Sequence, residues 1–104
     1  GDWLRELLLY LAANRDYLVD TVIRTLPGIQ VTVPEATYLA WLDCRNAGIP
    51  GNPQRFFLEQ AGVALNDGAT FGPGGEGFVR VNFACPRVRL AEALERMRGA
   101  LLKR

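Results

Sequence analysis

A chain of 104 residues with a net charge of +1 can bury one hydrophobic core and lacks the basic character of a dedicated nucleic-acid binder. Hydrophobic residues make up 49% of the sequence, which argues against disorder, and no apolar run approaches the roughly 20 residues of a membrane span. Histidine is absent, which excludes Ser–His–Asp and Cys–His catalysis and a usual zinc set. Composition predicts a single cytoplasmic domain over residues 1–104, with no nucleic-acid, membrane or metal partner.

The first third of the chain predicts a long helix and then a short strand. Asp2 is a favourable N-cap, and apolar residues recur at helical spacing over residues 3–23 until Pro27 and Gly28 stop the pattern. We expect this apolar stripe to pack on a sheet. Residues 29–33 are mostly β-branched and predict a strand.

The middle of the chain predicts a strand, a loop and a second helix. Residues 37–43 (TYLAWLD) are rich in aromatic and apolar residues, and their continuous apolar run predicts a strand that is buried on both faces. Residues 46–53 are dense in Gly, Pro and Asn and predict a loop. Pro53 suits the first turn of a helix that should end at Gly62.

The last third predicts two more strands and a closing helix. Residues 63–65 read as a short strand, residues 66–68 as a turn and residues 71–77 (FGPGGEG) as a glycine-rich loop. Residues 78–84 alternate in polarity as a strand does, and an amphipathic helix should begin after Pro86. The order α-β-β-α-β-β-α predicts an α/β (α+β-like) domain with a small, mainly antiparallel sheet covered by helices.

The glycine-rich loop has two interpretations. Glycine loops can hold phosphate groups through backbone N–H groups, but this loop leads into a strand and has no Gly-Lys-Ser/Thr ending. The sequence favours a mobile connection that needs positive φ at several glycines. The alternative is a loop that shapes a ligand site on another domain.

Arg80 stands out because it is a charged residue inside the predicted strand 78–84. Internal strand positions seldom hold a charge unless it is paired or faces a cleft. Asp43, Asp67 or Glu76 could form a structural ion pair with it, and the pattern alone favours that interpretation. The alternative is a planar clamp that binds the carboxylate of a ligand through two hydrogen bonds.

Other conspicuous residues have structural interpretations. Cys44 and Cys85 are interpreted as two buried thiols that act as small hydrophobic groups. The aromatic residues are assigned mostly to core faces: Tyr38, Trp41, Phe56, Phe57 and Phe83. The basic residues of the last helix are assigned to a solvated face: Arg87, Arg89, Arg96, Arg98, Lys103 and Arg104.

Three segments of the chain, in this order and at this spacing, form a specific combination. They are residues 34–45 (PEATYLAWLDCR), 56–63 (FFLEQAGV) and 64–87 (ALNDGATFGPGGEGFVRVNFACPR). Together they resemble the C-terminal small domain of pyridoxal-phosphate (PLP) enzymes of the aminotransferase class I/II superfamily, which have fold type I. Within that superfamily the chain is most similar to cystathionine β-lyase-like carbon–sulfur lyases, and the resemblance extends over its whole length.

The resemblance implies a role for Arg80, which lies in the matching motif FVRVN. In this superfamily an arginine at that position binds the α-carboxylate of the amino-acid substrate and so orients the bond to be broken. The resemblance also implies PLP as cofactor of the full-length enzyme, which should be a homodimer. A β-lyase of this kind would act on a sulfur-containing amino acid and release a thiol, pyruvate and ammonia. The small domain of a PLP-dependent aminotransferase is the nearest alternative.

The chain departs from the family in one respect that matters for chemistry. Its sole lysine, Lys103, is the penultimate residue, so the Schiff-base lysine of a PLP enzyme is missing. We therefore expect an excised C-terminal small domain without the PLP-binding large domain, which contributes no catalytic and no cofactor-binding residue. Alone, it should bind no PLP and be inactive. A free-standing, non-catalytic α/β interaction module is the alternative from another class.

Overall fold

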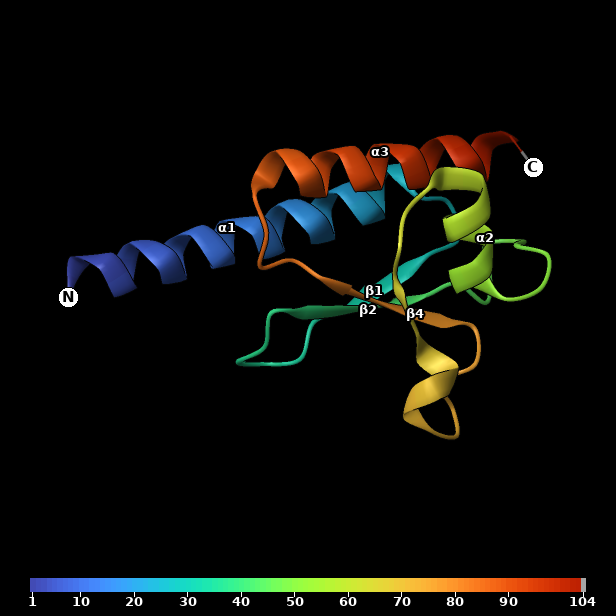
Figure 1. Cartoon of the computed structure of the whole chain (residues 1–104), viewed down its shortest axis with the longest axis horizontal. Helices are drawn as coiled ribbons and strands as arrows, with labels where there is room; N and C mark the ends of the chain where they lie inside the picture. The colour runs from blue at the N-terminus through green and yellow to red at the C-terminus, as the bar shows by residue number, and fades with distance from the viewer. Residues whose placement is uncertain (104) are drawn as a thin grey trace.

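Three α-helices cover one face of a four-stranded sheet in the computed structural model, which describes residues 1–103 (Figure 1). The strands lie in the order β1-β2-β4-β3, and each neighbouring pair is antiparallel. The predicted fold class is confirmed. None of the helices within residues 1–103 is long and apolar enough to cross a membrane. In chain order the elements are α1 (Asp2–Thr25), β1 (Gln30–Thr32), β2 (Leu39–Asp43), α2 (Pro53–Ala61), β3 (Asn66–Asp67), the 3₁₀ helix η1 (Gly68–Phe71), β4 (Phe78–Asn82) and α3 (Arg87–Lys103).

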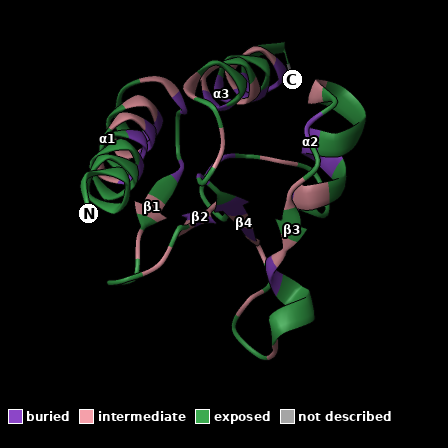
Figure 2. Cartoon of the chain, turned by 60° about the vertical axis from the view of Figure 1, so that its left-hand side comes forward, coloured by how far each residue is buried: buried purple, intermediate pink, exposed green. Residues whose placement is uncertain are grey.

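The core lies between the sheet and the helices. Alternate residues of the two central strands point toward the helices and are buried: Ala40, Leu42, Val79 and Val81. They pack with Leu18 of α1, Phe57 of α2 and Leu94 of α3, among others. Figure 2 shows the three helices arched over one face of the sheet, while η1 projects from the other.

The second face of the sheet stays open in this chain. The residues of β2 on that face, Leu39, Trp41 and Asp43, are only partly buried. The expectation that β2 is buried on both faces is therefore wrong for residues 1–103. The run TYLAWLD does not alternate between apolar and polar residues because the open face carries apolar side chains as well.

Helix α1 packs through its second half only. Its buried residues begin at Leu11, and the first turns project beyond the sheet (Figure 1). The expectation that the whole apolar stripe packs is thus confirmed for Leu11, Leu18 and Val22 but is wrong for the first turns and for Ile23, which is exposed. Asp2 is already helical and Gly1 is the N-cap, so the predicted capping role of Asp2 is wrong. The exposed large side chains of the first half of α1 are Trp3, Leu4, Leu7, Leu8, Leu9 and Tyr10.

The segment after α2 differs from the prediction. Helix α2 ends as expected at Gly62, which adopts a left-handed φ of 67°. The backbone N–H of Val63 then donates to the carbonyl oxygen of Phe57 at 3.1 Å. Residues 63–65 form no strand, because this N–H closes the helix; Val63 is buried and Leu65 partly buried. Of the predicted turn 66–68, residues 66–67 form β3, which pairs with β4.

Candidate functional site

A row of side chains crosses the open face of the sheet at the level of Arg80. Thr32 of β1 pairs with Trp41 of β2, Trp41 pairs with Arg80 of β4, and Arg80 pairs with Asn66 of β3. Residues directly opposite each other in antiparallel strands point to the same face. The four side chains therefore lie side by side, and Arg80 is placed within the sheet rather than at its edge.

An aromatic ring and an amide hold the guanidinium of Arg80. Its Cζ atom lies 4.3 Å from the centroid of the Phe71 ring, and its Nη2 donates a long hydrogen bond of 3.4 Å to Oδ1 of Asn66. Its Nε is buried and has no hydrogen-bond partner among residues 1–103. A buried donor without an acceptor is costly, so a group that accepts a hydrogen bond from Arg80 would be stabilising.

The three carboxylates that could pair with Arg80 are engaged elsewhere. Asp43 forms a 2.8 Å ion pair with Arg45, whose hydrogen bond lowers the pKa of that carboxyl below its usual value. Asp67 and Glu76 each accept a hydrogen bond from a backbone N–H two residues away. Within the described chain Arg80 takes part in no ion pair, so its interpretation as a structural ion pair is wrong. Its positive charge is left without a neutralising partner.

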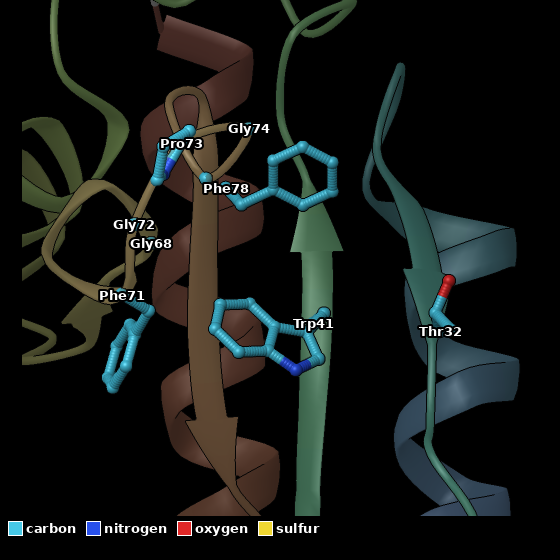
Figure 3. Close-up of a pocket in the computed structure, with 9 residues that line it drawn as sticks. Thr32, Trp41, Gly68, Phe71, Gly72, Pro73, Gly74 and Phe78 are labelled. Carbon is cyan, nitrogen blue, oxygen red and sulfur yellow. The ribbon is translucent and has the colours of Figure 1, made fainter.

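A hollow of about 410 Å³ opens on this face; Arg80 does not line it, but Trp41 and Phe71, which flank Arg80, do. Its walls include Trp41, Phe71, Phe78 and Thr32, together with glycine-loop residues 72–75 (Figure 3). The rings of Trp41 and Phe71 meet edge to face, with 5.5 Å between their centroids. Trp41 therefore belongs to the open face, and its assignment to the core is wrong.

The glycine-rich loop forms a shaped wall of this hollow. Gly72, Gly74 and Gly77 have the predicted positive φ, at 117°, 90° and 86°. Gly68 is required for another reason, since a Cβ there would lie 2.5 Å from the carbonyl oxygen of Gly75. The loop backbone thus closes on the turn that precedes it. The positive φ values predicted for this loop are confirmed, and residues 72–75 line the hollow. The interpretation in which the loop shapes a ligand site stays a prediction.

The remaining aromatic and cysteine predictions are confirmed in part. Phe56, Phe57 and Phe83 are buried in the core, whereas Tyr38 is exposed, so its core assignment is wrong. Both cysteines are free thiols, but only Cys44 is buried, and Cys85 is partly exposed. Burial, followed by the charge of Asp43, raises the pKa of the Cys44 thiol to about 12, which keeps it protonated and unreactive.

The basic face of α3 is largely solvated, as predicted. Arg96 and Arg98 form exposed ion pairs with Glu92 and Glu95 of the same helix. Arg104 lies outside the described residues. Arg87 is the exception, because it is drawn into a buried network.

Sequence reasoning missed the centre of that network, Asn14. Its side chain is fully buried, and Nδ2 donates to the carbonyl oxygens of Phe83 (3.0 Å) and Cys85 (2.7 Å). Its Oδ1 accepts a 2.6 Å hydrogen bond from Nε of Arg87, whose guanidinium also covers the ring of Tyr17. These bonds tie α1 to the segment between β4 and α3. The available signal was an amide within an apolar stripe.

The fold is thus an antiparallel sheet with one open face, on which Arg80 pairs with no carboxylate of residues 1–103. The family model of aminotransferase class I and II matches residues 1–97. The chain belongs to this family.

Two sequence relatives and one solved structure agree with this family. The chain is 39% identical to Protein MalY of Escherichia coli and 38% identical to the cystathionine beta-lyase of Corynebacterium glutamicum, over 95% and 96% of its length. The PLP-bound C-S lyase of Staphylococcus hominis, solved with the inhibitor L-cycloserine, superposes with a TM-score of 0.89, at 34% identity, over 99% of the chain and 28% of that structure. The chain spans only 26% of the length of each of the two sequence relatives.

The residues of this chain do not form a PLP site. A PLP enzyme needs a lysine that can form a Schiff base with the cofactor. The one lysine of the sequence, Lys103, is exposed in the last turn of α3, remote in sequence from every residue of the open-face row. No residue here is assigned to the cofactor.

Proposed function

We propose that this chain is the C-terminal small domain of a PLP-dependent β-carbon–sulfur lyase and that Arg80 binds the α-carboxylate of the amino-acid substrate. The observation that carries the proposal is the state of the Arg80 guanidinium. It is partly buried on the open face, no carboxylate pairs with it, and its Nε lacks an acceptor among the described residues.

The geometry suits a carboxylate better than a single-atom anion. A guanidinium presents two parallel N–H groups that match the two oxygens of a carboxylate, which fixes orientation as well as charge. Phe71 covers one side of the guanidinium, and Trp41 lies next to it in the row. These rings border the guanidinium with apolar surface, which strengthens the attraction between the two charges. Arg80 can therefore hold a substrate in one orientation while its reactive end lies beyond this chain.

The cofactor and the reaction proposed for the full-length enzyme rest on the relatives. We propose that residues outside this chain bind PLP and that the protein cleaves a sulfur-containing amino acid to a thiol, pyruvate and ammonia. Relatives named as a cystathionine beta-lyase and a C-S lyase support this choice. We further propose a cytoplasmic homodimer without a nucleic-acid or membrane partner.

An aminotransferase is the second candidate, because the family model that matches the chain is that of aminotransferase class I and II. The two can be separated with the full-length protein and L-cystathionine. A β-lyase releases pyruvate in the absence of any added 2-oxo acid. An aminotransferase needs a 2-oxo acid as acceptor and converts it to the corresponding amino acid. A free-standing interaction module is less well supported, since the named relatives include enzymes.

The role of Arg80 is tested by two variants of the full-length enzyme. We expect Arg80→Ala to lower kcat/KM for L-cystathionine by about 100-fold, because losing one partner of a desolvated charge pair costs about 2–5 kcal/mol. Arg80→Lys keeps the charge but loses the two parallel N–H donors of the guanidinium, so it should retain more activity than Arg80→Ala but less than the unaltered enzyme. PLP content, measured by absorbance, should be unchanged.

Arg89→Lys is the matched control, because Arg89 is exposed on α3 and should tolerate the same change. The proposal is wrong if Arg80→Ala leaves KM and kcat at the values of the unaltered enzyme. It is equally wrong if Arg80→Lys and Arg89→Lys behave alike.

A further inference from the structure

The first turn of α2 is linked to the first turn of η1 by one hydrogen bond. Asn52 is the N-cap of α2, and its Oδ1 accepts from the backbone N–H of Arg55 at 2.9 Å. Its Nδ2 donates to Oδ2 of Asp67 at 2.9 Å. Both ends of this amide are therefore used, one to cap its own helix and the other to hold a carboxylate 15 residues further along the chain.

Asp67 uses its second oxygen to cap η1. Its Oδ1 accepts from the backbone N–H of Ala69 at 3.0 Å, and its carbonyl oxygen accepts from Oγ1 of Thr70 at 2.7 Å. Its chain neighbour Asn66 lies directly opposite Arg80 in the register. Asp67 itself pairs with Val79, so its side chain lies on the helix-facing side of the sheet, and its carboxylate joins the N-terminus of α2 to the first turn of η1.

The capped turn carries the ring that covers Arg80. Phe71 is the last residue of η1, 4.3 Å from Cζ of Arg80, and its ring meets that of Trp41 edge to face. A single 3₁₀ turn has few internal hydrogen bonds, so its geometry depends on its cap. The position of the ring over the guanidinium therefore depends on the bond between Asn52 and Asp67.

We infer that Asn52 and Asp67 are positioning residues for Arg80, which they orient through η1 and Phe71. The inference rests on the proposed carboxylate-binding role of Arg80. When the link is intact, the Phe71 ring fixes one face of the guanidinium. When the link is broken, the ring loses its fixed position and Arg80 is held less well for the carboxylate of the substrate.

A reciprocal exchange of the two side chains tests the link in the full-length enzyme. Asn52→Asp keeps a good N-cap but removes the donor and places two carboxylates against each other. Asp67→Asn removes the charge, and its amide can then satisfy only one of its two present partners. In the double variant, the new amide at position 67 can donate to the new carboxylate at position 52, so the bond is restored with its direction reversed.

Two measurements report on Arg80 separately from overall stability. One is KM for L-cystathionine beside kcat, and the other is the dissociation constant of propionate, a carboxylate without an amino group, from an NMR titration. We expect each single variant to raise KM and the propionate constant about fivefold, which corresponds to the loss of one modest interaction, with kcat within about twofold. The double variant should return both constants to within about twofold of the unaltered enzyme.

The controls distinguish failure of the inference from failure of the proposed function. Asn46→Asp adds the same charge in an exposed loop and should change neither constant. If both single variants behave like Asn46→Asp while Arg80→Lys weakens propionate binding, the inference is wrong and the proposed function stands. If the double variant does not recover, the two residues act separately and the inference is also wrong. If Arg80→Lys changes neither constant, the proposed function itself fails.

Discussion

Asn14 and Arg80 are both polar residues within apolar sequence patterns, but only the side chain of Asn14 has all its hydrogen-bonding groups paired. Asn14 is fully buried and forms three hydrogen bonds, two as donor and one as acceptor. Arg80 is partly buried and has one long hydrogen bond and an Nε with no partner within residues 1–103. Buried polar groups in folded proteins are almost always satisfied. Asn14 therefore belongs to the structure itself, whereas the unused donor of Arg80 supports the role proposed for that residue.

This difference predicts a large stability effect at Asn14. Asn14→Ala leaves the carbonyl oxygens of Phe83 and Cys85 and the guanidinium of Arg87 without their partner. We expect the free energy of unfolding of the 104-residue chain, measured by urea titration, to fall by about 2–4 kcal/mol. Asn46→Ala, in an exposed loop, should change it by less than about 0.5 kcal/mol. Equal effects of the two substitutions would contradict the structural role of the network.

The elements that sequence could predict are those with local signals. Pro53 and Gly62 mark the two ends of α2 through backbone chemistry that needs no tertiary information. Residues 63–65 were misassigned because their apolar side chains indicate burial, while the N–H of Val63 is already used to close the helix. Side-chain pattern cannot reveal how a backbone N–H is used, and the mistake followed from that.

The candidate site was less predictable than the fold for the same kind of reason. The motif around Arg80 pointed to this residue, but pattern could not decide between an ion pair and a ligand clamp. That decision depends on which groups bind the carboxylates of Asp43 and Asp67, namely the nearby Arg45 for Asp43 and the more distant Asn52 for Asp67. The role of Asn52 was missed because its only visible signal was that of a helix cap.

Two glycines in or next to helices should respond to alanine with opposite sign. Gly62 ends α2 with a left-handed φ of 67°, so Gly62→Ala strains the backbone and should lower the free energy of unfolding by about 1 kcal/mol. Gly99 lies inside α3, where a Cβ would meet nothing within 4 Å. Gly99→Ala should raise the same free energy by about 0.5–1 kcal/mol, because alanine favours a helix. Urea titration of both variants checks the pair, and a shared sign would contradict one of the two conformations.

At the scale of the whole molecule, apolar side chains occur in three settings. One set fills the core between the helices and the sheet, and a second surrounds the hollow on the open face. A third set covers the first half of α1, which projects from the body of the molecule (Figure 1). Monomeric proteins rarely expose a contiguous apolar patch of this kind. The hydrophobic residues of this chain therefore do not all serve its own folding.

The exposed half of α1 should affect association without affecting stability. In the 104-residue chain, the side chains of Leu4 and Leu8 are 47% and 51% exposed, whereas Leu18 is 0% exposed. Replacing both Leu4 and Leu8 by Gln keeps good helix formers and should change the free energy of unfolding by less than about 0.5 kcal/mol. Leu18→Ala should lower it by about 2–5 kcal/mol because it leaves a cavity in the core. The Gln variant should also bind less of a fluorescent hydrophobic dye and sediment with less self-association than the unaltered chain. A large loss of stability in the Gln variant would show that this half of α1 packs on the chain itself, which would contradict the arrangement in Figure 1.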